Sequence, residues 1–188
     1  MSPNDDGATR AGTWAGTWAG ISVRLATASD ELQAVVALRH RLRRHDAFYD
    51  PDGDALRDAV SYVWMAEREG DLVATGRAIP FSTGAARSVE IEAPLGDIGV
   101  DDSFVEIGGL VADPGKGLLA GQAIMRLAAP WMARNTACRR VFGFCRQPVT
   151  VFYRRLGFAV RPAPFVPTRG SVSGIPLFLI HRDLGAQV

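Results

Sequence analysis

A glycine-rich turn between an apolar segment and a long helical pattern is the feature that most constrains this chain. The turn runs from Val111 to Gly121, between an expected strand over 104–111 and an expected helix over 118–135. The N–H groups at the start of a helix lack partners within the helix and carry partial positive charge, so they favour an anion such as a pyrophosphate. Three residues without side chains and one cation suit this role: Gly115, Gly117, Gly121 and Lys116. The turn predicts a phosphate-binding strand–turn–helix unit; the alternative is an ordinary turn of that kind.

Apolar periodicity elsewhere predicts a mixed α/β fold. We expect further strands over 21–25, 62–67, 72–79, 89–92, 140–145, 158–160 and 175–181, and further helices over 32–42, 55–61 and 148–156. Glu69-Gly70-Asp71 predicts a hairpin, and Thr27-Ala-Ser-Asp30 has the spacing of a helix-capping box. The order of these elements predicts an α/β (α+β) domain with a partly antiparallel sheet flanked by helices. A length of 188 residues suits one such domain over 21–188, preceded by a flexible tail over 1–20 whose tryptophans can dock onto it.

Charge is unevenly divided along the chain. Residues 114–182 contain eleven Lys or Arg and no Asp or Glu, although the net charge of the whole chain is only +1. Such asymmetry indicates either that this part meets an anion or that its cations pair with the acids of the first half. No recognition helix, zinc-finger or aromatic RNA-binding pattern accompanies the basic stretch, so a nucleic-acid partner is not expected.

Composition excludes several other classes. Two cysteines, Cys138 and Cys145, are too few for a disulfide framework or a four-cysteine zinc site, and the three histidines lack metal-binding spacing, so no metal is expected. No apolar run approaches the roughly 20 residues that span a bilayer, and the N-terminus has no secretory pattern, so a cytoplasmic protein without a membrane partner is expected. Cys145, at a strand end, is interpreted as a small buried residue rather than a nucleophile.

Two nucleotide-binding fingerprints fit the turn incompletely. A Walker loop fails at two positions, which hold Leu110 and Gly117. Gly115-x-Gly117-x-x-Ala120 matches a dinucleotide pattern, but the acid expected about 20 residues later is missing. A small NADP-binding protein remains an alternative, and it requires Arg139 or Arg140 to meet a ribose phosphate.

The turn resembles the cofactor turn of the GCN5-related N-acetyltransferase (GNAT) superfamily. Counted from Val111, that family has a basic residue five positions later and glycines six, eight and ten positions later; this chain has Lys116, Gly117, Leu119 and Gly121, and departs only at Leu119. Val151-Phe-Tyr-Arg-Arg-Leu-Gly-Phe158 resembles the late helix of the same family, although Arg146 stands where an Asn is common. The resemblance covers about residues 21–184.

The resemblance implies direct transfer of an acyl group, from acetyl-CoA or another acyl-CoA, to the amine of a small molecule. Tyr153 would protonate the departing thiolate, or is a core tyrosine; Glu106 would accept the amine proton, or pairs with an arginine of the basic stretch. The residues expected to bind the cofactor are Leu110, Val111, Lys116, Gly117, Leu118, Leu119, Ala120 and Gly121. A non-catalytic domain that binds acyl-CoA is the alternative.

The first half resembles one branch of these enzymes, the acyl-homoserine-lactone and long-chain N-acyl amino acid synthases. The similarity lies in 39–58 and in Thr75-Gly-Arg-Ala-Ile-Pro80. It implies an acyl carrier protein as an alternative donor, which a basic helix would attract. The arginines of that helix are Arg39, Arg41, Arg43 and Arg44, and their alternative partners are the acids that follow, Asp46, Asp50, Asp52, Asp54 and Asp58.

Overall fold

The computed structural model describes residues 14–46, 49–117 and 119–185. Within these residues the strands are β1 (Ala15–Trp18), β2 (Ile21–Leu25), β3 (Tyr62–Arg68), β4 (Asp71–Pro80), β5 (Phe104–Ala112), β6 (Arg140–Cys145), β7 (Ala159–Val160) and β8 (Phe178–Asp183). The helices are α1 (Ser29–Arg43), α2 (Pro51–Asp58), α3 (Arg87–Glu90), α4 (Ala120–Asn135) and α5 (Thr150–Arg155). None of the helices in these ranges is long and apolar enough to cross a membrane.

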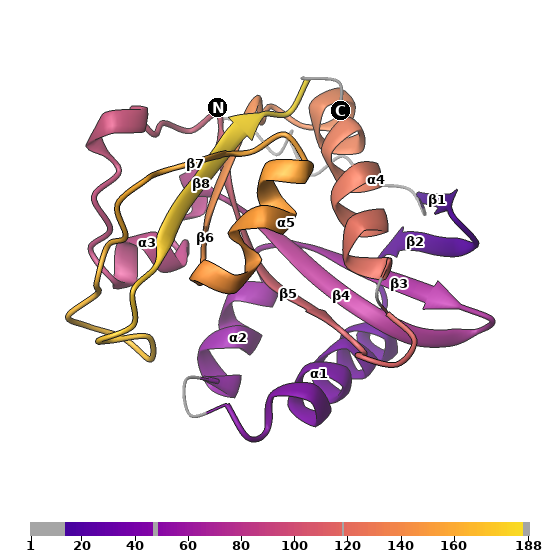
Figure 1. Cartoon of the computed structure of the whole chain (residues 1–188). Helices are drawn as coiled ribbons and strands as arrows, with labels where there is room; N and C mark the ends of the chain where they lie inside the picture. Colours follow the sequence, from indigo (N-terminus) through magenta and orange to yellow (C-terminus); the bar gives the residue numbers. More distant parts are fainter. Residues whose placement is uncertain (1–13, 47–48, 118, 186–188) are drawn as a thin grey trace, which may run out of the picture.

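All the described strands belong to a single sheet, in the order β1-β2-β3-β4-β5-β6-β8-β7. Every pair is antiparallel except β5 with β6, and α4 connects these two strands. Helices α4 and α5 cover one face of the sheet, and α1 and α2 lie on the other (Figure 1). The expected mixed, partly antiparallel sheet flanked by helices is confirmed.

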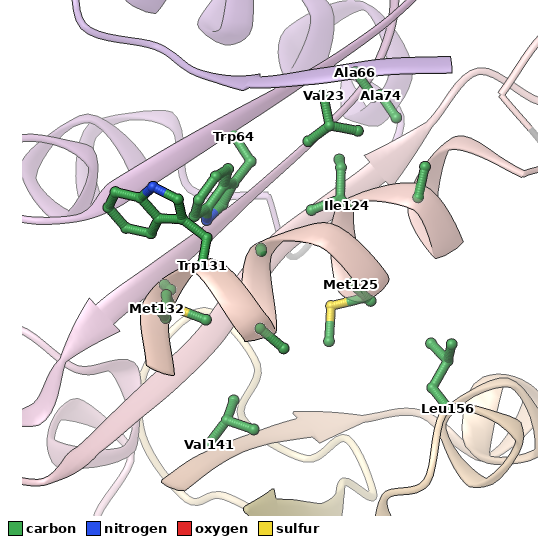
Figure 2. Close-up of a cluster of buried hydrophobic side chains, with 14 of the residues drawn as sticks. Val23, Trp64, Ala66, Ala74, Ile124, Met125, Trp131, Met132, Val141 and Leu156 are labelled. Atoms are coloured by element: carbon green, nitrogen blue, oxygen red, sulfur yellow. The ribbon is translucent and has the colours of Figure 1, made fainter. Parts of the chain in front are cut away.

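The main core lies between α4 and the sheet. Figure 2 shows Trp64 of β3 and Trp131 of α4 in this cluster, and their ring centroids are 5.1 Å apart. Ile124 and Met125 of α4 pack in the same layer, where Ile124 is 2% exposed. An amphipathic helix packed over the centre of a sheet therefore forms one side of the main apolar core that stabilises the fold.

Three local predictions differ from the structure. Part of the expected tail is strand β1, which pairs with β2. The ring centroid of Trp14, just before β1, lies 5.4 Å from that of Trp64. Residues 1–13 of the expected tail lie outside the described residues. Residues expected as a strand over 89–92 include the end of helix α3. The first turn of α1 is held by Glu31, whose carboxylate accepts the N–H groups of Thr27 and Ala28, and not by a Thr27–Asp30 box. A tertiary or neighbouring partner overrides the local pattern in each case.

Candidate active site

The central strands diverge halfway along β5. Residues Phe104 to Ile107 pair with β6, and the remaining residues of β5 have no partner strand on that side within the described sheet. On its other side β5 contains a bulge: Thr75 pairs with Val111 and Arg77 with Gly108, so that Gly109 and Leu110 oppose Gly76 alone. Gly109 has φ +59°, which glycine adopts without strain. Divergence and bulge together open the sheet at its centre.

A cavity of about 310 Å³ occupies this opening on the α4 and α5 side. We call it the donor slot; its lining residues include Leu110, Asp113, Gly117, Gly121, Phe152 and Tyr153. At Gly121 an added Cβ would contact the Leu110 and Phe152 side chains at 3.9–4.0 Å, so the missing side chain leaves the slot open. The slot therefore combines an unpaired strand edge, a helix N-terminus and a phenol.

The glycine-rich turn is organised by Asp113. Its Oδ1 accepts the N–H groups of Gly115 at 2.9 Å and Lys116 at 3.2 Å, and its carbonyl accepts the N–H of Gly117 at 2.7 Å. Three of the amides next to the expected phosphate site are thus engaged within the turn. At the start of α4 the amide of Ala120 donates to the carbonyl of Gly117 at 2.9 Å, and the amide of Ala123 donates to the carbonyl of Leu119 at 2.9 Å. The amides of Gly121 and Gln122 lie between these two, at the positive end of the helix dipole.

Gly117 is required for a different reason from the one the sequence indicated. An added Cβ would lie 2.8 Å from the amide nitrogen of Asp113 and 2.8 Å from the carbonyl oxygen of Val73. Both contacts are with backbone, so the glycine allows the turn to pack against β4 rather than making room for a ligand. Gly115 has only an ordinary contact, with Asp113 Oδ1 at 3.5 Å.

The other expected cofactor-binding residues are dispersed. Val111 pairs with Thr75 in the sheet, Ala120 is fully buried in the core, and Leu119 is 43% exposed. Lys116 is exposed and forms an ion pair with Asp71. Leu118 lies outside the described residues. The structure thus brings Leu110, Gly117, Gly121 and Tyr153 together at one slot.

Tyr153 lies on α5, at the boundary between the donor slot and the apolar core. Its ring makes edge-on contacts with Phe152 and Phe158, and 8% of the residue is exposed. Burial, with a smaller contribution from Cys145, raises the pKa of its hydroxyl well above the usual value, so it remains protonated at neutral pH. Tyr153 therefore belongs to the core and also presents a protonated phenol at the slot.

Glu106 is 3% exposed and does not line the donor slot. Its two carboxylate oxygens accept the backbone N–H groups of Arg87 at 3.0 Å and Ser88 at 2.8 Å. Burial raises the pKa of Glu106, and these N–H groups oppose that effect. The carboxylate thus holds the start of α3 against β5, which explains why residues near 89 are helical.

A second cavity, of about 160 Å³, begins where Glu106, Gly108 and Gly109 form its β5 wall. We call it the arginine cavity, after Arg43, Arg57, Arg77, Arg87 and Arg146, which also line it. Sequence reasoning did not identify these residues as a site. Arg77 belongs to the Gly-Arg end of an expected strand, whereas nothing local marks Arg57 or Arg87.

The basic stretch is partly neutralised within the fold. Five of its eleven cations pair with acids that precede the stretch: Lys116 with Asp71, Arg140 with Asp101, Arg146 with Asp46, Arg161 with Asp97 and Arg169 with Glu92. Arg139 donates to the carbonyls of Thr136 and Cys138. The pairing alternative therefore accounts for much of the charge asymmetry, and neither Arg139 nor Arg140 is set aside for a ribose phosphate.

Some of the arginines of the basic helix α1 are likewise neutralised by ion pairs within the fold. Arg39 is fully buried and pairs with Asp58, and Arg43 pairs with Asp46 at 3.1 Å. Arg41 remains 60% exposed and lies 3.8 Å from Asp113. Two of the four arginines thus stabilise the fold rather than forming an exposed patch.

Cys145 is buried at the end of β6. Burial raises the pKa of its thiol to about 11, which Arg154 only partly opposes, so it is a poor nucleophile at neutral pH. Among the residues the structure describes, no cluster of three or more His, Cys, Asp or Glu side chains is arranged to hold a metal ion.

No family model matches the sequence, and no curated protein matches it. Solved structures do match its fold. An acyl-CoA N-acyltransferase from Pseudomonas aeruginosa superposes with a TM-score of 0.62 at 18% identity, over 86% of this chain and 97% of that one. FeeM, an N-acyl amino acid synthase from uncultured soil microbes, superposes with a TM-score of 0.65 at 15% identity, over 87% of this chain and 91% of that one.

A GNAT family acetyltransferase from Elizabethkingia anophelis, with acetyl-CoA bound, superposes with a TM-score of 0.58 at 10% identity, over 88% of this chain and 99% of that one. The superposition covers nearly the whole length of each of these proteins. The chain therefore has the fold of the GCN5-related N-acetyltransferase superfamily.

Proposed function

We propose that this chain transfers an acyl group from an acyl-CoA thioester directly to the amine of a small molecule. The donor slot is the observation that carries the proposal, because it joins an unpaired strand edge to a helix N-terminus and a protonated phenol. Proteins of similar fold described as N-acyltransferases, and one with acetyl-CoA bound, support it.

The slot suits the pantetheine arm of CoA. Beyond Ile107 the edge of β5 facing α5 is free of other described strands, so the amides of an extended arm can pair with Leu110 and Val111 as an added strand would. The start of α4, at Gly121, then faces the pyrophosphate with backbone amides and the positive end of the helix dipole. Lys116 lies exposed on the same turn and adds a cation.

The reaction requires one bond to form and one to break. The amine nitrogen attacks the thioester carbonyl carbon, a C–N bond forms, and the C–S bond breaks as the oxyanion collapses. Tyr153 supplies a proton to the departing thiolate, and Glu106 receives the proton of the amine directly or through water. The products are an N-acyl amine and free CoA.

CoA is preferred to an acyl carrier protein as the donor. Both carry the same arm, so the slot accepts either. The basic helix is the reason to consider a carrier protein, and two of its arginines, Arg39 and Arg43, are engaged in internal ion pairs.

The test is turnover of a panel of acyl-CoA thioesters with a panel of amines, read by release of free thiol and by mass spectrometry of the N-acyl product. Gly121→Leu should fill the slot and abolish turnover, whereas Gly121→Ala should retain it, because the added methyl meets only ordinary contacts. Equal turnover in Gly121→Leu and wild type would refute the donor slot. CoA binding without turnover of any pair would instead indicate the non-catalytic domain.

A further inference from the structure

The arginines that line the arginine cavity differ in their ion-pair partners among the described residues. Arg77 pairs with Asp54 and Asp58, Arg57 pairs with Glu90, and Arg43 pairs with Asp46. Arg87 differs: among the described residues no carboxylate oxygen lies within 4 Å of its guanidinium, which donates one hydrogen bond to Ser171 Oγ. An incompletely paired, largely buried charge is costly unless a ligand compensates it.

Other hydrogen-bond donors around the cavity are also incompletely used. Arg77 and Arg57 are 4% and 7% exposed, yet Nε of Arg77 and Nη1 of Arg57 have no hydrogen-bond acceptor within the described parts of the chain. Nε of Arg87 is likewise buried without an acceptor. Burial and the neighbouring Arg57 lower the pKa of Arg87, and the carboxylates of Glu90 and Asp54, which lie beyond ion-pair distance, oppose this shift only in part. The wall thus offers several N–H donors to an anion.

The β5 wall of the same cavity has the opposite character. Glu106 is a buried carboxylate fixed by two backbone amides, and it lines the cavity together with Gly108 and Gly109, which precede the donor-slot residue Leu110 on β5. Arg77 Nε would lie 3.9 Å from a Cβ at Gly108, so the guanidinium layer begins directly beside the bulge. A molecule with a positive amine end and a negative end complements this arrangement.

We propose that the arginine cavity binds an acceptor amine that carries a carboxylate, a small amino acid, with the carboxylate at Arg87 and the amine directed to Gly108 and Gly109 on β5. This inference rests on the proposed acyl transfer and names the class of its acceptor. A planar guanidinium matches a carboxylate with two parallel hydrogen bonds, which an ammonium group does not reproduce.

Cavity size limits the acceptor. A protein cavity of about 150 Å³ encloses a benzene-sized molecule, and the arginine cavity has about 160 Å³. A small amino acid fits this volume, whereas a peptide would have to project out of it. The acceptor class is therefore free amino acids rather than protein N-termini.

The experiment compares each amino acid with its carboxamide, which keeps the amine and removes the negative charge. Glycine, alanine and serine are paired with glycinamide, alaninamide and serinamide. Binding is measured by calorimetry in the presence of CoA, and kcat/KM is measured with acetyl-CoA and octanoyl-CoA. The variants are Arg87→Gln and Arg87→Lys, with Arg68→Gln as the matched control, because Arg68 is exposed on β3 away from both cavities.

Arg87→Gln should lower affinity and kcat/KM for the amino acids by about 10- to 100-fold, the usual effect of losing hydrogen bonds to a charged group, and should leave the amides unchanged. Arg87→Lys should restore part of the loss, and Arg68→Gln should behave as wild type. The inference would be overturned, while acyl transfer stood, if the carboxamides matched the amino acids in affinity and kcat/KM with the wild type. Equal losses for carboxamides and amino acids in Arg87→Gln would overturn it in the same way. Arg87-dependent binding of amino acids without turnover would support the cavity and refute the transfer. Binding of neither class would overturn the inference outright.

Discussion

Asp58→Asn tests whether a buried ion pair beneath the bulge stabilises the whole fold. Asp58 is 8% exposed and pairs with Arg39, which is fully buried, and it also accepts a hydrogen bond from Arg77 at 3.1 Å. A Cβ at Gly109 would lie 3.2 Å from the Arg39 guanidinium, so this pair directly supports the bulge. The substitution keeps the size of the side chain and removes its charge.

The expected loss follows from what remains. Arg39 stays charged and buried with only Thr75 Oγ1, at 3.5 Å, as a further partner among the described residues. Removing one partner of a buried pair typically costs about 3–5 kcal/mol. A chain of this size loses about 2–4 °C in Tm for each kcal/mol, so Tm should fall by about 6–20 °C.

Thermal and urea unfolding measure this loss, with Asp71→Asn as the control. Asp71 pairs with Lys116, but both side chains are more than half exposed, so its loss should leave Tm close to that of the wild type. Asp58→Asn melting within about 2 °C of Asp71→Asn would refute the reasoning, since solvent would then be compensating Arg39.

Four further predictions concern the slot and its surroundings. Tyr153→Phe should lower kcat about 100-fold with unchanged CoA affinity by calorimetry, and full activity would assign the acid role elsewhere. Gly117→Ala should lower the free energy of unfolding by about 1–3 kcal/mol, because the added methyl group would contact backbone atoms of Asp113 and Val73. Gly115→Ala should change the free energy of unfolding by less than about 0.5 kcal/mol, and equal effects of the two substitutions would contradict the close packing of the turn against β4. Alkylation of Cys145 by iodoacetamide should be slow at pH 7 and accelerate as pH approaches 11, and rapid reaction at pH 7 would exclude the raised pKa. Burial acts to raise the pKa of Asp54, but the ion pair with Arg77 outweighs burial, so the pKa is lowered. The stability that Asp54 contributes is present above its usual pKa and is lost as the pH falls through its lowered pKa in the folded state. The difference in free energy of unfolding between wild type and Asp54→Asn should therefore narrow from pH 7 to pH 3, and a constant difference would argue against the pairing.

Local patterns were sufficient for the framework of the fold. The hairpin of β3 and β4, strand β6 and helix α4 each depend on periodicity and turn residues that lie close together in sequence. The strand–turn–helix unit ending at Gly121, with the Tyr153 helix, is identifiable for the same reason from the amino-acid sequence alone. Its likeness to GNAT sequences agrees with the observed fold.

Tertiary contacts decided what local patterns could not. Residues near 89 form a helix because Glu106, a neighbour only in space, accepts the amides at its start. Gly117 is needed because Val73 of another strand packs against it.

The sequence by itself indicated the glycine turn and the helix start that border the donor slot, because these are properties of one short segment. The opening of the slot itself comes from the partial pairing of β5 with β6 and from the bulge in β5, which are tertiary features. Only the tertiary structure decided which arginines remain available to bind an anionic ligand. Whether an arginine is neutralised depends on carboxylates distant in sequence: the fold brings Asp54 and Asp58 within ion-pair distance of Arg77, whereas no carboxylate of the described residues lies within 4 Å of the Arg87 guanidinium.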